Sequence, residues 1–188
     1  MFFTGDAGTG KSYVLRLIVT ALKEKLGAKK VFVTASTGIA ACNIGGTTLH
    51  SFAGMGNSLY REMNELFVGL GDDSVTKCVS KILKNKKAKQ RWQTCEVLII
   101  DGIQSFYCQN CIVEISMLDG RLFDKLEAVA RRVRGKDDCF GGIQVIACGD
   151  FFQLPPVGLG KNNVIYCFEC ECWNAVIQVN TYEWREKK

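Results

Sequence analysis

The chain has 188 residues, 47% of them hydrophobic and 23% charged, which is the composition of a folded domain of ordinary size. This apolar content excludes an intrinsically disordered chain. The sequence lacks an apolar run of the roughly 18 residues that a membrane span needs. Lysine and arginine total 24 against 19 acidic residues, so the net charge of +5 permits a polyanionic partner without identifying one.

Short apolar runs alternate with longer amphipathic stretches, which is the pattern of a parallel sheet covered by helices. The apolar runs predict strands over residues 2–4, 31–34, 96–100 and 143–148. Apolar residues at helical spacing predict helices over residues 10–26 and 118–134. One face of the first helix carries Val14, Leu15, Ile18, Val19 and Leu22. The sequence therefore predicts a single three-layer α/β domain with a mostly parallel central sheet.

The ten cysteines raise the question of disulfides. Met1 leads directly into two phenylalanines and a glycine-rich stretch, so we expect no secretory signal. We therefore expect an intracellular protein with free thiols. Cys95 and Cys148 lie in or beside apolar runs, where cysteine usually behaves as a small buried hydrophobe. Because a strand begins at the first residue, we also expect the chain to be a fragment.

The stretch 81–92 carries five lysines and one arginine. Its usual interpretation is a solvated helix or loop. The alternative is contact with the phosphate backbone of a nucleic acid.

Residues 5–12 fit the pattern G-x-x-x-x-G-K-[ST] and lie where a strand leads into a helix. Glycines let backbone N–H groups turn toward phosphate oxygens, and the helix N-terminus adds partial positive charge. Lys11 would reach the β- and γ-phosphates, while Ser12 would ligate Mg²⁺. The predicted nucleotide-binding residues are Gly5, Ala7, Gly8, Thr9, Gly10, Lys11 and Ser12. We therefore predict ATP and Mg²⁺ as ligands, in a P-loop NTPase domain.

Two further elements follow predicted strands. Asp101 comes directly after an apolar strand, where a P-loop enzyme needs a carboxylate to hold Mg²⁺. Gln153 lies shortly after the strand over 143–148. A glutamine at the carboxyl edge of a parallel sheet faces the ligand crevice, where it can contact a γ-phosphate or position water. Three such elements in this order predict nucleotide binding.

Seven stretches together resemble successive motifs of the PIF-type DNA helicases of superfamily 1. They are residues 5–12, 34–41, 46–52, 98–101, 114–120, 140–144 and 149–157. The resemblance covers nearly the whole chain and implies the first RecA-like motor domain of an ATP-dependent DNA helicase, truncated at both ends. It implies 5′ to 3′ movement on single-stranded DNA, in DNA repair, recombination or telomere maintenance, or within transposons. It also implies a second RecA-like domain, missing here, and a place in the nucleus or mitochondrion.

The resemblance also implies DNA-contacting residues in two segments. They are Ser36, Thr37, Gly38, Thr48, His50, Ser51 and Phe52. Hydroxyls, one histidine and one phenylalanine on glycine-rich loops are suited to bond a backbone and stack a base. Without the family, His50 is more typical of a hydrogen-bonded structural histidine. Arg185, in Trp-Arg-Glu where the family has Phe-Arg-Gln, would be an arginine finger on the γ-phosphate.

The acidic motif departs from the family, which reads Asp-Glu-Ile-Ser-Met without a break. Here Gly102 follows Asp101, and the glutamate that would act as general base is Glu114. The 12 residues 102–113 are therefore an insertion, either a retained intron of 36 nucleotides or a segment that loops out of the sheet. A positioned base contributes about 10²–10⁴-fold to rate. A displaced Glu114 would therefore slow hydrolysis and leave ATP binding intact.

Two other functions stay compatible with these residues. One is a non-catalytic nucleotide- or DNA-binding relic of a helicase or transposon gene, in which the split acidic motif is real. The other is a P-loop ATPase of different purpose, such as a loader or remodeller. The motif around His50 and the element containing Gln153 argue against the second.

Two groups of cysteines have spacings that zinc sites use. They are Cys108 with Cys111, and Cys167 with Cys170 and Cys172. The chain has a single histidine, the first pair lies in the insertion, and the resembled family needs no zinc here. We therefore expect no zinc site.

Overall fold

The computed structural model describes residues 1–5, 9–35, 38–54, 72–101, 118–152 and 165–177. In this part of the chain, one five-stranded sheet has the order β1-β5-β4-β2-β3. The strands are β1 (Phe2–Phe3), β2 (Val31–Ala35), β3 (Thr47–Thr48), β4 (Val97–Asp101) and β5 (Gln144–Cys148). Every neighbouring pair is parallel. The predicted α/β class and parallel sheet are confirmed.

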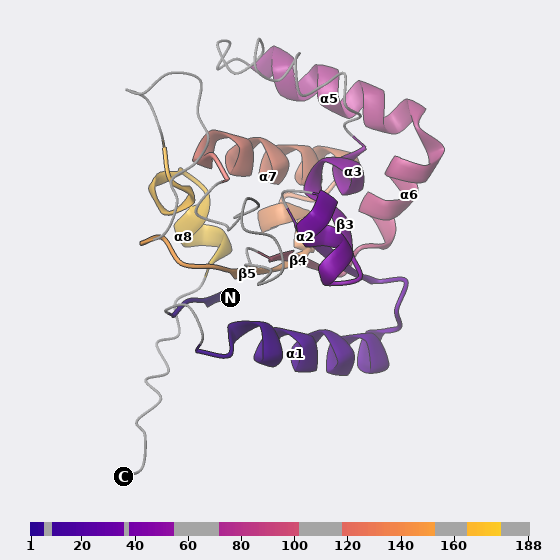
Figure 1. The fold of residues 1–188 in the computed structure, drawn as a ribbon. Coiled ribbons are helices and arrows are strands. Elements are labelled where there is room, and N and C mark those ends of the chain that lie inside the picture. Colours follow the sequence, from indigo (N-terminus) through magenta and orange to yellow (C-terminus); the bar gives the residue numbers. More distant parts are fainter. Residues whose placement is uncertain (6–8, 36–37, 55–71, 102–117, 153–164, 178–188) are drawn as a thin grey trace.

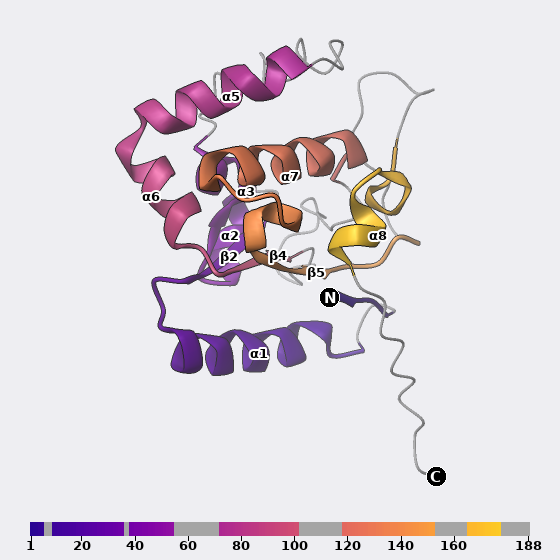
Figure 2. The same ribbon diagram turned by 180° about the vertical axis from the view of Figure 1, so that it is seen from behind.

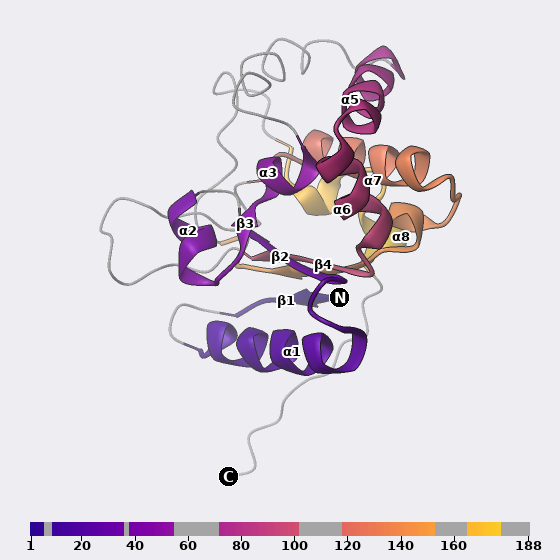
Figure 3. The ribbon, with the colours of Figure 1, turned by 90° about the vertical axis from the view of Figure 1, so that its right-hand side faces the viewer.

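Helices cover both faces of the sheet and give three layers (Figure 1). The α-helices are α1 (Lys11–Leu26), α2 (Gly38–Asn43), α3 (Leu49–Ala53), α5 (Asp72–Lys84), α6 (Lys86–Thr94), α7 (Gly120–Arg134) and α8 (Trp173–Val176). Two short 3₁₀ turns are η2 (Cys139–Gly142) and η3 (Cys167–Glu169). The helix α1 lies on one face, while α5, α6, α7 and α8 lie on the other (Figures 2 and 3).

The side chains of β4 alternate between the two layers of core, as a strand buried on both faces requires. Val97 and Ile99 belong to the cluster that α1 covers, whereas Leu98 and Ile100 belong to the cluster under α7. All five residues of the strand are buried. The prediction of a central strand is therefore confirmed.

One row of paired residues crosses the sheet at the carboxyl ends of its strands. The row runs Phe3, Cys148, Asp101, Ala35 and Thr48. Neighbouring strands lie about 4.8 Å apart, so the row spans about 19 Å. Because all strands are parallel, the loops that leave this row share one edge of the sheet, where ligands bind in open α/β folds.

Cysteines behave largely as expected in the described residues, where all eight are free thiols. Cys95 and Cys148 are fully buried, which confirms their role as small core residues. Burial raises the pKa of Cys95 to about 12, so this thiol stays protonated at neutral pH. No helix in the described ranges is long and apolar enough to cross a membrane.

The lysine-rich stretch 81–92 is not one element. The helix α5 ends at Lys84, and α6 begins at Lys86 after the N-cap residue Asn85. The Asn85 Oδ1 atom accepts hydrogen bonds from the backbone N–H groups of Lys87 and Ala88, both at 3.1 Å. Trp92 is fully buried, so the expected solvated stretch has a core-facing side.

Candidate nucleotide and DNA sites

The glycine-rich loop leaves β1 and leads into α1. Gly10 precedes the helix in a left-handed conformation with φ 84°, which glycine adopts without strain. The Lys11 ammonium group donates a hydrogen bond to the carbonyl of Gly5, so the side chain lies back toward the end of β1. The first turn of α1 contains no acidic residue. Its positive end is therefore not neutralised locally and suits a phosphate group.

Asp101 ends β4 at the same edge of the sheet. Its pairing with Cys148, which in turn pairs with Phe3, puts it two strands away from the strand that feeds the loop, about 10 Å laterally. The residue is 2% exposed. A buried carboxylate requires cationic or hydrogen-bonding partners. Mg²⁺ takes carboxylate and hydroxyl oxygens, so Asp101 and the half-buried Ser12 at the start of α1 fit that ion.

Asp150 is a buried acidic residue that sequence reasoning did not single out. It is 5% exposed and follows β5 by two residues. Its Oδ1 atom accepts a hydrogen bond from the backbone N–H of Phe152 at 3.0 Å. The preceding residue, Gly149, donates its backbone N–H to the carbonyl of Phe3 at 3.0 Å. Asp150 therefore turns the chain beside the start of the glycine-rich loop. Sequence reasoning could have found Asp150 because it is an acidic residue just past an apolar strand.

The second predicted segment forms β3 and the short helix α3. The Thr48 hydroxyl caps this helix by accepting a hydrogen bond from the backbone N–H of Ser51 at 3.0 Å. Ser51 is exposed, and His50 is half-buried. Burial lowers the pKa of His50 below its usual value, which favours a neutral imidazole at physiological pH. Neutral polar groups at this edge are suited to hydrogen bonds with a DNA backbone.

Phe52 does not fit the expected stacking on a DNA base. The side chain is 0% exposed. Its ring packs against Phe32 and Trp92, with centroid separations of 5.2 and 4.9 Å. The expectation of a ring presented to DNA was therefore wrong, because the sequence pattern did not distinguish the inner face of α3 from its outer face.

Side chains of α6 hold the end of α3. Arg91 donates to the carbonyls of Phe52 and Ser51 at 3.0 and 2.7 Å. The indole N–H of Trp92 donates to the carbonyl of Ala53 at 3.2 Å. A cation at the carboxyl end of a helix is electrostatically favourable. Two residues of the lysine-rich stretch therefore position the candidate DNA segment.

Several predicted residues lie outside the described ranges. They are Ala7, Gly8, Ser36, Thr37, Glu114, Gln153 and Arg185, together with the insertion 102–113. Gly38, the remaining DNA-contact candidate, is exposed at the start of α2.

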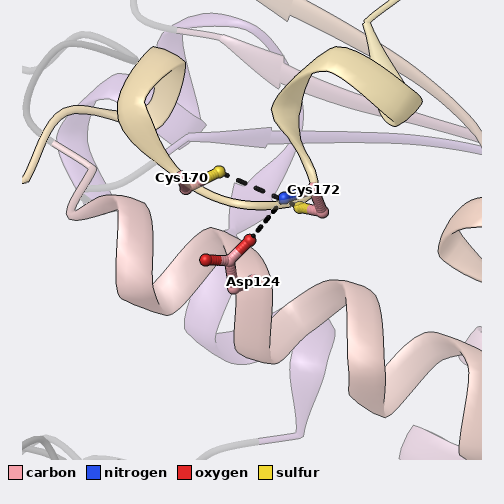
Figure 4. A group of neighbouring side chains, drawn as sticks. All are labelled: Asp124, Cys170 and Cys172. Atoms are coloured by element: carbon pink, nitrogen blue, oxygen red, sulfur yellow. Dashed lines mark hydrogen bonds between the residues drawn. The ribbon is translucent and has the colours of Figure 1, made fainter.

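The cysteine group near α8 has a structural explanation. Asp124, Cys170 and Cys172 offer ligand atoms within 4.8 Å of one another (Figure 4). However, the Asp124 carboxylate accepts the backbone N–H groups of Glu171 and Cys172 at 3.2 and 2.9 Å. The pKa of Cys172 is raised by the hydrogen bond that this thiol shares with Cys170, by burial and by the nearby Asp124. The group thus braces the turn against α7 with a protonated thiol, and the absence of zinc stays a prediction.

A parallel sheet with a glycine-rich loop after β1, a helix that starts at that loop, and an acidic residue ending β4 defines a P-loop NTPase domain of the RecA-like class. Within that class, the model of the PIF1-like helicase family matches residues 1–187. The chain belongs to the PIF1-like helicase family, which confirms the resemblance of its motifs.

Similar proteins and structures agree with that assignment. The ATP-dependent DNA helicase PIF1 of Xenopus laevis is 48% identical over 179 residues, 95% of this chain and 24% of the relative. The helicase RRM3 of Saccharomyces cerevisiae is 44% identical over 180 residues, 95% of this chain and 21% of that protein. The crystal structure of Pif1 helicase from Candida albicans has a TM-score of 0.74 at 47% identity, covering 95% of this chain and 34% of that one.

Two bacterial structures contain ligands. Bacteroides sp. Pif1 in complex with ADP-AlF4 has a TM-score of 0.56 at 32% identity over 91% of this chain and 34% of that one. Bacteroides Pif1 bound to ssDNA has a TM-score of 0.61 at 31% identity over 92% of this chain and 35% of that one. The chain spans about a quarter of the curated relatives it matches.

Proposed function

We propose that this chain is an ATP-binding motor domain of a DNA helicase, in which ATP hydrolysis drives 5′ to 3′ movement on single-stranded DNA. Such a motor works in DNA repair, recombination or telomere maintenance, in the nucleus or the mitochondrion. It requires a second RecA-like domain that closes over the nucleotide from the other side. The relatives' descriptions as ATP-dependent DNA helicases support this proposal.

One observation carries the proposal: the row at the carboxyl edge of the sheet. The row has Phe3, from which the glycine-rich loop leaves, at one end and Thr48, the cap of α3, at the other. Asp101 lies between them, in the middle strand of the row. A nucleotide at the loop and a DNA strand at α3 would therefore contact one rigid sheet, which links hydrolysis to movement of the DNA contacts.

Predicted residues other than Phe52 have the following roles in this proposal. Lys11 binds the β- and γ-phosphates, and Ser12 and Asp101 hold Mg²⁺, which would neutralise charge on the phosphates when bound. The remaining assignments are Glu114 as the general base, Gln153 as the contact to γ-phosphate or water, and Arg185 as the arginine finger. Thr48, His50 and Ser51, with the segment 36–38, contact the single strand.

Nucleotide binding by the 188-residue chain tests the first step. The substitution Lys11→Ala removes a charged hydrogen-bond donor to phosphate, a loss of about 1.5–3 kcal/mol, or roughly ten- to hundred-fold in affinity for Mg²⁺-ATP. Titration with a fluorescent ATP analogue measures it. Lys25→Ala, an exposed lysine on the same helix, is the matched control and should bind as the wild type does. Equal affinity of all three proteins would contradict the assignment of the loop.

The split acidic motif favours a second candidate, a non-catalytic nucleotide- or DNA-binding relic. Asp101 ends β4, and Glu114 follows only after the 12-residue insertion. ATP hydrolysis by two proteins separates the two functions. One is the chain joined to a second RecA-like domain, and the other is the same fusion without residues 102–113. If only the shortened form hydrolyses ATP in the presence of single-stranded DNA, the insertion breaks the site. Equal turnover by both forms would exclude the relic. Sequencing the spliced transcript decides whether the insertion is an intron.

A further inference from the structure

The basic charge of this chain is concentrated in one segment. Residues 74–95 contain seven of the 24 lysines and arginines and no acidic residue, which leaves 17 basic against 19 acidic residues elsewhere. The net charge of +5 therefore arises wholly from this segment. A solvated face usually mixes both signs. A segment that carries more than the whole net charge is instead typical of a surface that attracts a polyanion.

Four of these lysines form a surface where α5 meets α6, which we call the lysine corner: Lys84, Lys86, Lys87 and Lys89. All four are exposed. The ion pairs found among the described residues join Lys30 to Glu96, Arg121 to Asp119, and Arg131 to Glu127, so none neutralises the corner.

The position of these lysines does not serve the stability of α6. Lys86 and Lys87 are the first two residues of the helix, and its first turn contains no acidic residue. The N-terminus of a helix carries partial positive charge, so cations there are unfavourable and carboxylates favourable. A partner therefore explains lysines at this position better than the stability of the helix does.

The lysine corner adjoins the candidate DNA segment. Arg91, which binds the carbonyls of Ser51 and Phe52, lies one helical turn after Lys87 on the same face of α6. A Cβ atom built on Gly54, at the end of α3, would come within 2.4 Å of the Ala88 Cβ. The start of α6 therefore touches the end of α3, while α1 lies on the far face of the sheet (Figure 3).

We propose that the lysine corner binds the phosphate backbone of double-stranded DNA beside the single strand at α3. The domain would then bind the junction between single-stranded and double-stranded DNA. This inference rests on the proposed function. Trp92, the one aromatic residue of 74–95, is fully buried, so the corner offers charge without a ring for base stacking. Single-strand sites combine charge with stacking. Charge alone suits a duplex, whose paired bases are enclosed and whose phosphates are exposed.

The triple variant K86Q/K87Q/K89Q tests the proposal in the 188-residue chain. Its matched control is K23Q/K25Q/K29Q, which removes the same charge from the end of α1 and the turn after it. Fluorescence anisotropy would follow a labelled duplex with a single-stranded arm, and the arm alone, across salt concentrations. We expect the corner variant to weaken junction binding roughly ten-fold or more at about 0.1 M salt, and to lower the salt slope by about 2–3. Binding of the arm alone should match that of the control.

Each other outcome is decisive. The duplex assignment would be overturned if the corner variant and the control lost junction binding equally. It would also be overturned if the corner variant lost as much affinity for the single-stranded arm as for the junction. Both outcomes leave the proposed function intact. Binding of neither DNA by the wild-type chain would overturn the lysine corner and the single-strand contacts at α3, while the proposed ATPase motor would still be tested by turnover of the chain joined to a second RecA-like domain. A second variant, K86E/K87E, should melt at the same or a higher temperature because it improves α6, yet lose junction binding. A lower melting temperature would show that these lysines serve the fold.

Discussion

The two faces of the sheet are covered in very different ways. In the part of the chain that the structure describes, α1 is the long helix on one face, and Leu15 is its one buried residue, while Tyr13 and Leu17 are 69% and 54% exposed. On the other face α7, with eight buried residues, packs together with α5, α6 and α8. The aromatic side chains Phe52, Trp92, Phe123, Phe140 and Trp173 are buried there.

The two layers therefore have different roles in the molecule. The layer formed by α1, here called the thin layer, presents the start of that helix, where Lys11 and the helix N-terminus are the proposed phosphate-binding groups. The layer formed by α5, α6, α7 and α8, here called the thick layer, fixes α3 through Arg91 and Trp92 and carries the lysine corner. Stability should therefore depend mainly on the thick layer, whereas nucleotide binding should depend on the thin one.

Removing the indole of Trp92 should have the largest effect on stability. The side chain is fully buried, packs on Phe52 and donates to the carbonyl of Ala53. We expect Trp92→Ala to lower the free energy of unfolding by about 3–5 kcal/mol, measured by urea denaturation. The neighbouring exposed Gln93→Ala should change it by less than about 0.5 kcal/mol. Similar losses in both variants would contradict the importance of this layer.

Truncating Leu15 probes the thin layer. The residue is 4% exposed and packs on β2, β4 and β5. Because its neighbours on α1 reach solvent and can relax into the space, we expect Leu15→Ala to cost about 2 kcal/mol, the low end for such changes. Leu17→Ala on the outer side of the same helix is the control and should be nearly neutral. A loss as large as that of Trp92→Ala would show that the layers contribute equally.

The sequence predicted the elements that have long apolar runs. Continuous apolar residues identified β4, and helical spacing identified α7. The inner face of α1 was predicted correctly at Leu15, Ile18, Val19 and Leu22, which pack in the core. The prediction that Val14 faces the core was wrong, since this residue is 44% exposed. It lies at the edge of the apolar stripe, where periodicity alone does not decide between core and solvent.

Other features depend on contacts between distant residues. The strand β3 is two threonines that pair with β2 only through the backbone, so it has no apolar signal. The burial of Phe52 depends on Trp92, 40 positions later. The strand order, with β5 between β1 and β4, is likewise a result of tertiary pairing. Motif spacing could locate the loop and Asp101 because the loop follows β1 directly and Asp101 is the last residue of β4.

The cap at Asn85 gives a smaller effect within the thick layer. Its Oδ1 atom accepts two backbone N–H groups at the start of α6. We expect Asn85→Ala to lower the free energy of unfolding by about 1 kcal/mol, measured by thermal or urea denaturation. Asn85→Asp keeps the acceptor and should retain most of the stability, because aspartate is an equally good cap. Loss of stability in both variants would show that the asparagine amide group makes a contact beyond the cap.

The smallest expected effect is the pH dependence that His50 introduces. Burial lowers its pKa in the folded chain, so the unfolded chain binds the proton more readily. The stability contribution is fully present above the unfolded pKa of about 6.5 and is lost as pH falls through and below that value. In His50→Gln, which cannot titrate, the fall in melting temperature between pH 7.5 and 5.5 should be smaller than in the wild type. An identical fall would place the acid sensitivity in other groups, and α3 would then tolerate a charged imidazole at the proposed DNA contact.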